Sequence, residues 1–286
     1  MDEYIIGICN ASPLPNTSTG FTPFVTSSTQ KRTNPAAVLP GAKSIIAVGV
    51  GYKDNIPQPY KPIPKNAGLI ASFAAAEDYH AIIKSLLENI ADNLKKHLNF
   101  KYKTLIDSPT LDERALAVRA GLGFFGRNGL VVSPEYGTRF GIGLMLTDME
   151  IETLKKIIHP TSEEPPPSIG MACPPGCNKC AAACPTAALS RTGSYDVSRC
   201  ISYLTQKDHL TQGEMAIMGN HLYGCDICQD ACPFNKPQPT AWALPEDWLS
   251  MSDDEFKTKY GHTPMMWRGA ELLRRNAEIV LRNTTH

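Results

Sequence analysis

A repeated cysteine pattern constrains the fold of this chain more than any other feature. Eight of the nine cysteines lie between residues 173 and 232. Two segments share the spacing C-x2-C-x3-C-P, one starting at Cys177 and the other at Cys225. Each segment is preceded by one further cysteine, Cys173 or Cys200. The pattern is therefore an imperfect internal repeat, and its ligand chemistry limits how this part of the chain can fold.

The spacing is typical of cysteines that hold two 4Fe–4S clusters. A cubane cluster needs four thiolates, of which three come from one tight loop. In bacterial two-cluster ferredoxins the fourth is the cysteine before the proline of the other motif. This rule predicts one cluster on Cys173, Cys177, Cys180 and Cys232, and a second on Cys184, Cys200, Cys225 and Cys228. The first gap is one residue longer than usual, and we expect Pro174, Pro175 and Gly176 to form a bulge there.

Three other interpretations compete with two clusters. Disulfide bonds are disfavoured because we find no secretory signal and because cysteines so close together suit a metal better. Two structural zinc sites with four cysteines each are the stronger rival, but zinc usually shows two separated C-x2-C pairs rather than C-x3-C-P ends. One cluster with spare thiols does not explain the repeat.

Length and composition limit the remaining possibilities. A chain of 286 residues can bury a large core and is expected to hold about two domains. The formal net charge is zero, so no overall positive field attracts nucleic acid. No apolar run reaches 18 residues, and the first residues carry no export signal, so we expect a cytoplasmic protein without a membrane span. Cys9 lies in a short apolar run and is expected in the core.

Strands and helices alternate along the first half, which predicts an α/β or α+β fold there. Apolar and β-branched runs predict strands at 4–9, 44–52, 102–106, 129–133 and 140–146, and periodic patterns predict helices at 68–98, 111–123 and 265–283. A proline-rich stretch at 161–170 suggests a boundary. We therefore expect an α/β domain at 1–160, a ferredoxin-like domain at 161–240 and a helical segment at 241–286.

Two groups of polar residues stand out beside the cysteines. Asp107 follows a predicted strand, where active groups of α/β sheets gather, although a turn-capping aspartate is the plainer interpretation. Asp78, Tyr79 and His80 fall inside the predicted helix at 68–98, and we interpret them as a helix face that meets the sheet. Four arginines of the last helix are expected on a solvated face, with contact to phosphates as the alternative: Arg268, Arg274, Arg275 and Arg282.

The chain resembles the epoxyqueuosine reductases, cobalamin-dependent iron–sulfur enzymes of tRNA modification that are related to reductive dehalogenases. The similarity runs in order along nearly the whole sequence. It is carried by RTNPAAVLPGAKSIIAV (32–48), AAAEDYHAIIKSLL (74–87), IDSPTLDERALAVRAGLGFFGRNGLVVSPEYGTRFGIG (106–143), CNKCAAACPTAAL (177–189), RCISYLTQ (199–206) and GNHLYGCDICQDACPFN (219–235). Longer members continue into a helical-repeat region, which we expect this shorter form to lack.

The resemblance implies a set of cofactors and residue roles. It implies an N-terminal domain and a cluster domain that together hold cobalamin, with two 4Fe–4S clusters as its electron source. Asp107 matches the proton-donating aspartate of the family. An aspartate has an ordinary pKa of about 3.9, so burial or bound substrate must raise the pKa of Asp107 if it is to act as an acid. Six positions match residues lining the corrinoid: Arg32, Val131, Ile142, Ser202, Asp226 and Ile227.

The implied reaction is reduction of epoxyqueuosine to queuosine at the wobble position of tRNA with a GUN anticodon. The implied partners are that tRNA and a flavodoxin- or ferredoxin-type electron donor, and a monomer is expected. Two alternatives stay open: a related corrinoid reductase with another substrate, as in reductive dehalogenases, and a ferredoxin-type electron carrier. A carrier of that type needs only the cluster fold, so the preceding domain argues against it.

Overall fold

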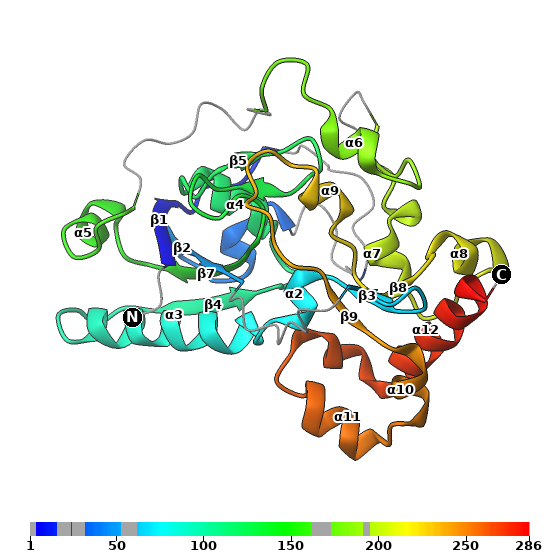
Figure 1. Ribbon diagram of the computed structural model, residues 1–286. Helices are drawn as coiled ribbons and strands as arrows, with labels where there is room; N and C mark the ends of the chain where they lie inside the picture. Colours follow the sequence, from blue (N-terminus) through cyan, green and yellow to red (C-terminus); the bar gives the residue numbers. More distant parts are fainter. Residues whose placement is uncertain are drawn as a thin grey trace. The chain divides into compact units, whose positions relative to one another are not determined.

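The computed structural model shows two compact units of mixed α and β structure (Figure 1). The N-terminal unit comprises residues 1–51 and 79–177, and the C-terminal unit comprises residues 52–78 and 178–286. The structure describes residues 4–15, 24, 32–52, 62–161, 173–190 and 195–285. Most of the proline-rich stretch at 161–170 therefore lies outside the described residues. No helix in the described ranges is long and apolar enough to cross a bilayer.

A four-stranded sheet with the order β1-β2-β7-β4 forms the centre of the N-terminal unit. Its strands are β1 (Tyr4–Asn10), β2 (Ser44–Gly51), β4 (Tyr102–Ile106) and β7 (Phe140–Thr147). Every neighbouring pair is antiparallel, so the unit is α+β rather than α/β. Strands and helices alternate along the sequence because the connection between β2 and β4 contains a helix. These two strands run in the same direction on either side of β7.

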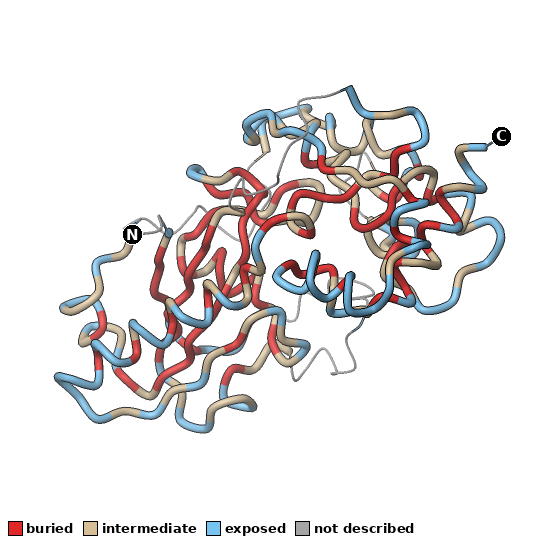
Figure 2. Tube along the Cα trace, turned by 60° about the horizontal axis from the view of Figure 1, so that its bottom comes forward, coloured by how far each residue is buried: buried red, intermediate tan, exposed pale blue. Residues whose placement is uncertain are grey.

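Helices cover both faces of this sheet. Around it lie η1 (Pro35–Ala37), α3 (Tyr79–Lys95), α4 (Glu113–Arg119), α5 (Ile151–Lys155) and the short ladder of β5 (Phe124–Phe125) with β6 (Val131–Val132). Ile45 and Ala47 share a core with α4, and alternate residues of β2 point to the other face. Figure 2 shows that the strands are buried over most of their length.

Two glycines of β7 allow α3 to lie close against the sheet backbone. A Cβ atom at Gly143 would lie 2.2 Å from Ile83 Cγ2, and one at Gly141 would lie 2.6 Å from Tyr79 Cδ2. Both distances are far below van der Waals contact, so a side chain at either position would push the helix away. The glycines thereby set the position of Tyr79 at the start of α3.

The C-terminal unit is built on a small mixed sheet with the order β8-β3-β9. Its strands are β3 (Gly68–Ile70), β8 (His221–Tyr223) and β9 (Ala241–Ala243). One short helix follows β3, and five more lie within and between the cysteine motifs: α2 (Ser72–Ala75), α6 (Lys179–Ala183), η2 (Val197–Arg199), α7 (Ile201–Leu204), α8 (Gln212–Ile217) and α9 (Ile227–Asp230). The last part holds α10 (Pro245–Ser250), α11 (Asp253–Tyr260), η3 (Pro264–Arg268) and α12 (Gly269–Thr284).

The predicted helix at 68–98 is wrong at its N-terminal end. Residues Gly68–Ile70 form β3, which pairs with β8 in parallel and with β9 in antiparallel orientation. The helical segment predicted at 241–286 packs into the C-terminal unit, where Trp248 and Leu273 share one core with Ile70 and Leu222. The strands that pair with Gly68–Ile70 lie more than 150 residues away in the sequence. Local periodicity does not report such partners.

Asn276 of α12 fastens two segments of the C-terminal unit from inside its core. It is fully buried, and its Nδ2 atom donates to Thr205 O at 2.7 Å and to Leu222 O at 2.8 Å. We expect Asn276→Ala to lower the free energy of unfolding by about 2–4 kcal/mol, because two buried carbonyls lose their donor. Denaturant titration measures the change.

A matched control, Asn283, lies two turns further along the same helix. Asn283 Nδ2 donates to Met215 O at 2.9 Å and to Gly219 O at 2.8 Å, but it is exposed. Water can replace its hydrogen bonds, so Asn283→Ala should change the free energy of unfolding by no more than about 0.5 kcal/mol. Equal losses in the two variants would contradict the assignment of the effect to burial.

Candidate active site and cluster ligands

Asp107 lies directly after β4 in a conformation that is uncommon for a residue with a side chain. Its φ angle is +48°, in the left-handed region. Its Oδ2 atom accepts a hydrogen bond from the hydroxyl of Tyr79 and lies 3.2 Å from Nε2 of His80. The side chain is 56% exposed, so the carboxylate stays accessible while both partners hold it. A left-handed non-glycine residue is expected where the surroundings determine it, often at a functional site.

The two partners of Asp107 come from the first turn of α3. The rings of Tyr79 and His80 stack with centroids 4.3 Å apart. The interpretation of these residues as a helix face against the sheet is confirmed for Tyr79, which is buried beside Gly141. The sequence did not indicate that both polar ends meet Asp107. The available signal was the sequence Asp-Tyr-His placed after a run of alanines, at the point where the helix begins.

The electrostatics of Asp107 differ from the sequence expectation. Partial desolvation of the carboxyl by the surrounding protein raises its pKa, but hydrogen bonds from His80 and Tyr79 outweigh this effect, and the charges of His80 and Arg114 add to them. The pKa of Asp107 therefore lies below its ordinary value, and the carboxyl is ionised at neutral pH. The surroundings of Asp107 in the free protein do not make it an acid, which leaves bound substrate as the source of the required upward shift of its pKa.

A second carboxyl group lies next to the turn that carries Asp107, and the sequence patterns did not identify it as part of the site. Glu113 is the first residue of α4 and is only 8% exposed. One of its carboxyl oxygens, Oε1, accepts a hydrogen bond of 2.9 Å from the backbone N–H of Ser108. Burial raises the pKa of Glu113 to about 8, and the negative charge of Asp107 adds to the shift. The site thus pairs an ionised carboxylate with a carboxyl that keeps its proton at neutral pH.

Glu113 should make the stability of the protein depend on pH. Between its ordinary pKa of 4.5 and about 8, the native protein keeps a proton that the unfolded chain releases. The free energy of unfolding should then fall as pH rises through this window, by at most about 1.4 kcal/mol per pH unit. Glu113→Gln removes this term, so its stability relative to the unsubstituted protein should rise from pH 5 to pH 8.

Denaturant titrations at several pH values test this dependence. Glu88→Gln, on the exposed face of α3, serves as the control and should run parallel to the unsubstituted protein. If the difference between Glu113→Gln and the unsubstituted protein stayed constant from pH 5 to pH 8, Glu113 would not carry the proton.

The cysteines of the second predicted cluster all lie in the C-terminal unit, and their charges influence one another. Burial raises the pKa of Cys225 to about 12, and charges on Cys200 and Cys184 add to this effect. Burial also raises the pKa of Cys228, with contributions from Cys225, Cys200, Cys180 and Cys184, of which Cys180 belongs to the first predicted set. Four thiols whose charges act on one another in a partly buried site need cations before they can all ionise. This donor set fits a 4Fe–4S cluster.

Cys184 differs from the other members of this set. Burial raises its pKa, but hydrogen bonds from Thr186, Leu189 and Ala188 outweigh it, so the pKa is lowered. The Sγ atom of Cys184 lies 3.5 Å from Oγ1 of Thr186. Hydrogen bonds to cysteine sulfur stabilise the thiolate and help to set the reduction potential of a bound cluster. The loop after Cys184 therefore stabilises the thiolate form of this cysteine.

The first predicted cluster set is divided between the two units. Cys173 and Cys177 lie at the C-terminal end of the N-terminal unit, whereas Cys180 and Cys232 belong to the C-terminal unit. This set of four therefore stays a prediction. Within the N-terminal unit, Sγ of Cys173 accepts a hydrogen bond of 3.4 Å from the backbone N–H of Arg127. The longer gap between the first two cysteines forms a turn, in which Cys177 N donates to Pro174 O and Gly176 has a φ angle of +74°.

The six residues matched to corrinoid contacts occupy both units. In the N-terminal unit, the carbonyl of Arg32 accepts from Asp112 N at 3.0 Å, while Val131 is buried and Ile142 is partly buried in the core. In the C-terminal unit, Asp226 accepts from Ser72 N at 2.6 Å, and Ser202 and Ile227 lie in α7 and α9. Their role toward a corrinoid stays a prediction.

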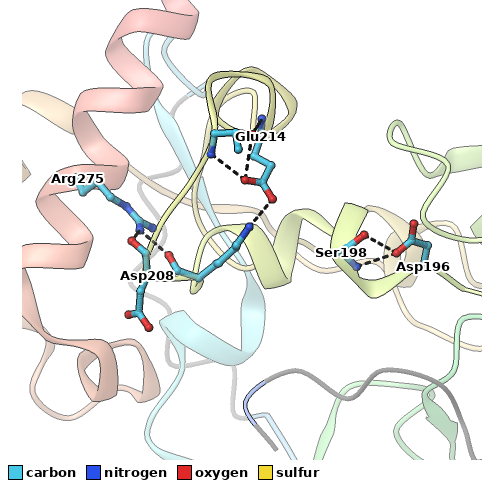
Figure 3. Close-up of polar contacts among 7 residues, drawn as sticks. Asp196, Ser198, Asp208, Glu214 and Arg275 are labelled. Atoms are coloured by element: carbon cyan, nitrogen blue, oxygen red, sulfur yellow. Dashed lines mark hydrogen bonds and ion pairs between the residues drawn. The ribbon is translucent and has the colours of Figure 1, made fainter.

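The four arginines of η3 and α12 mostly hold parts of the C-terminal unit together. Arg275 donates to Lys207 O at 2.5 Å and to Asp208 O at 2.7 Å, which fastens the loop between α7 and α8 (Figure 3). Arg274 binds Asp253 at 2.6 Å, and Arg268 pairs with Asp208. Arg282 lies 3.8 Å from Glu278 on the exposed side. These contacts favour a structural role for the arginines within the C-terminal unit over a phosphate-binding face.

Comparison with known proteins agrees with this arrangement. Residues 32–108, which end next to Asp107, match a family model described as "Epoxyqueuosine reductase QueG, DUF1730". Residues 173–235 match a model described as a 4Fe-4S double cluster binding domain. The chain is 36% identical over 267 residues to the epoxyqueuosine reductase of Bacillus subtilis, covering 88% of this chain and 66% of that relative. It thus spans about two thirds of the length of the first curated relatives it matches.

Solved structures show the same likeness. A crystal structure of epoxyqueuosine reductase with an epoxyqueuosine-modified tRNA-Tyr stem loop has a TM-score of 0.83 at 30% identity, and the match covers 98% of this chain and 77% of that one. The epoxyqueuosine reductase from Streptococcus thermophilus has a TM-score of 0.82 at 30% identity, with 97% and 77% covered. From these matches and the paired family models, the chain belongs to the epoxyqueuosine reductase family.

Proposed function

We propose that this protein reduces epoxyqueuosine to queuosine at the wobble position of tRNA with a GUN anticodon. One observation carries the proposal: a match to the epoxyqueuosine reductase model ends at a held carboxylate, Asp107, and a double-cluster model covers the cysteine motifs of the same chain. The relative whose crystal structure includes an epoxyqueuosine-modified stem loop supports tRNA as the substrate.

The reaction needs two electrons and two protons, because the epoxide oxygen leaves as water. When bound, the two 4Fe–4S clusters supply single electrons and cobalamin supplies the reducing centre near the substrate. The cluster ligands are the two sets of four cysteines. Arg32, Val131 and Ile142 from the N-terminal unit, with Ser202, Asp226 and Ile227 from the C-terminal unit, are the residues we assign to cobalamin.

Asp107 handles the proton at the departing oxygen in this proposal. In the free protein its carboxylate is ionised, and Tyr79 O–H donates to Oδ2 while His80 Nε2 lies 3.2 Å away. A substrate that covers the exposed carboxylate removes water and raises the pKa of Asp107, so that it can take up a proton and deliver it to the oxygen. Tyr79 and His80 keep the carboxylate oriented throughout.

The remaining assignments come from the resemblance to the family. A flavodoxin- or ferredoxin-type protein supplies electrons to the clusters, and the enzyme works as a monomer in the cytoplasm, where the tRNA is found.

An anaerobic turnover assay tests the proposal. Protein with both clusters and cobalamin bound is mixed with a strong reductant and tRNA that carries epoxyqueuosine, and the nucleosides are read by mass spectrometry. Loss of one oxygen mass that depends on cobalamin is the expected result. No conversion by fully loaded protein would overturn the tRNA assignment and favour a corrinoid reductase with another substrate.

A further inference from the structure

Asp107 is held in place by its backbone as well as by its side chain. A left-handed conformation is disfavoured for a residue with a Cβ atom, so neighbouring contacts must maintain it. The carboxyl of Glu113 supplies those contacts: it accepts hydrogen bonds from the backbone of Asp107 and from Ser108 N, the latter at 2.9 Å. Two successive peptide groups at the end of β4 are thus fixed by one buried side chain.

This use of Glu113 is distinct from helix capping. The N-cap of α4 is Asp112, whose Oδ1 accepts from Ala115 N at 3.2 Å. Glu113 follows it but turns back toward Ser108, and only 8% of the residue is exposed. Burying a carboxyl group is unfavourable unless it is hydrogen-bonded, and the hydrogen bond that Glu113 accepts at 2.9 Å comes from Ser108, outside the helix. The buried acceptor therefore serves the turn that carries Asp107.

We propose that Glu113 is a positioning residue for the reaction, which fixes the Asp107–Ser108 backbone so that the Asp107 carboxylate meets the substrate at the place set by Tyr79 and His80. This inference rests on the proposed function, in which Asp107 handles the proton. Glu113 itself acts only through the turn and touches neither substrate nor cofactor.

The protonation state of Glu113 agrees with this role. Its pKa is raised to about 8, so at neutral pH it is an uncharged acceptor that does not repel the carboxylate beside it. The charged groups that act on it are Asp107, at the end of β4, and His80, on α3. Above about pH 8 a second negative charge would develop next to Asp107, and the site should become less favourable for the anionic carboxylate.

Two variants of similar size separate the roles of Glu113. Glu113→Gln keeps an oxygen acceptor at the same position without a titrating group, and Glu113→Met fills the same space without an acceptor. We expect Glu113→Met to lower kcat by about 100-fold with little change in KM, because a small displacement of a reacting group costs this much. Glu113→Gln should stay within a few-fold of the unsubstituted protein and should lose any fall in rate above pH 8.

Crystal structures of both variants give a readout that needs no turnover. Asp107 should leave the left-handed region in Glu113→Met and keep it in Glu113→Gln. A Glu113→Met protein with unchanged Asp107 geometry would overturn the inference, and so would equal impairment of the two variants. If the unsubstituted protein, fully loaded, fails to convert the tRNA, the proposed function fails, and the two crystal structures still decide whether Glu113 positions Asp107.

Discussion

Asp107→Asn is expected to lower turnover of epoxyqueuosine-tRNA by about 100- to 10,000-fold, the range usually lost with a general acid. Asparagine keeps the size of the side chain, accepts the hydrogen bond from Tyr79 and tolerates a left-handed φ angle. The substitution therefore removes the proton-carrying group and leaves the geometry. Single-turnover assays with nucleoside mass spectrometry measure the loss.

Two controls accompany this variant. Iron and cobalamin contents should equal those of the unsubstituted protein, because Asp107 belongs neither to the cysteine sets nor to the residues assigned to cobalamin. Asp92→Asn changes an exposed aspartate of α3 that pairs with Lys95, and it should turn over normally. Retained turnover in Asp107→Asn would show that the proton comes from elsewhere.

Cys225→Ala is expected to remove one of two clusters and to abolish turnover. Cys225 belongs to the set with Cys184, Cys200 and Cys228, whose charges act on one another in a partly buried site. Three thiolates leave one iron of a cubane without its protein ligand, and electrons then lack a complete route. Iron analysis and EPR of the reduced protein should show about half the cluster content.

Cys9→Ala provides the matched control, since it removes a cysteine outside the motifs. Cys9 is buried in the sheet, and burial raises its pKa to about 12, so it is a thiol rather than a ligand. It should keep both clusters. A protein that contains zinc and no iron after anaerobic reconstitution would instead revive the structural zinc sites.

The sequence predicted the parts of the fold that depend on local patterns. The strands β1, β2, β4 and β7 lie within a residue or two of the predicted runs, because buried strands need continuous apolar residues. The strand β3 was missed because its three residues are stabilised by β8 and β9, far away in the chain. The antiparallel order was missed because the βαβ-like spacing of β2, α3 and β4 says nothing about β7 between them.

The candidate site divides in the same way. Asp107 was found because it follows a strand in a segment with a strong family resemblance. Tyr79 meets it only because glycines in β7, more than 60 residues later, let α3 approach the sheet. Glu113 looked like an ordinary residue in the first turn of a helix, where acidic side chains are common. Its burial is a property of the packed unit, and no sequence pattern reports it.

The route of the chain has a consequence for dividing this protein into parts. The chain leaves the N-terminal unit after Gly51, returns at Tyr79 and leaves again after Cys177, so β3 is made long before the strands that pair with it. A gene cut at any single point near residue 177 would yield one fragment with an orphan apolar strand and another with a sheet that lacks its middle member. Expression as two halves should therefore fail, whereas a split that moves residues 52–78 with the C-terminal half keeps each sheet whole.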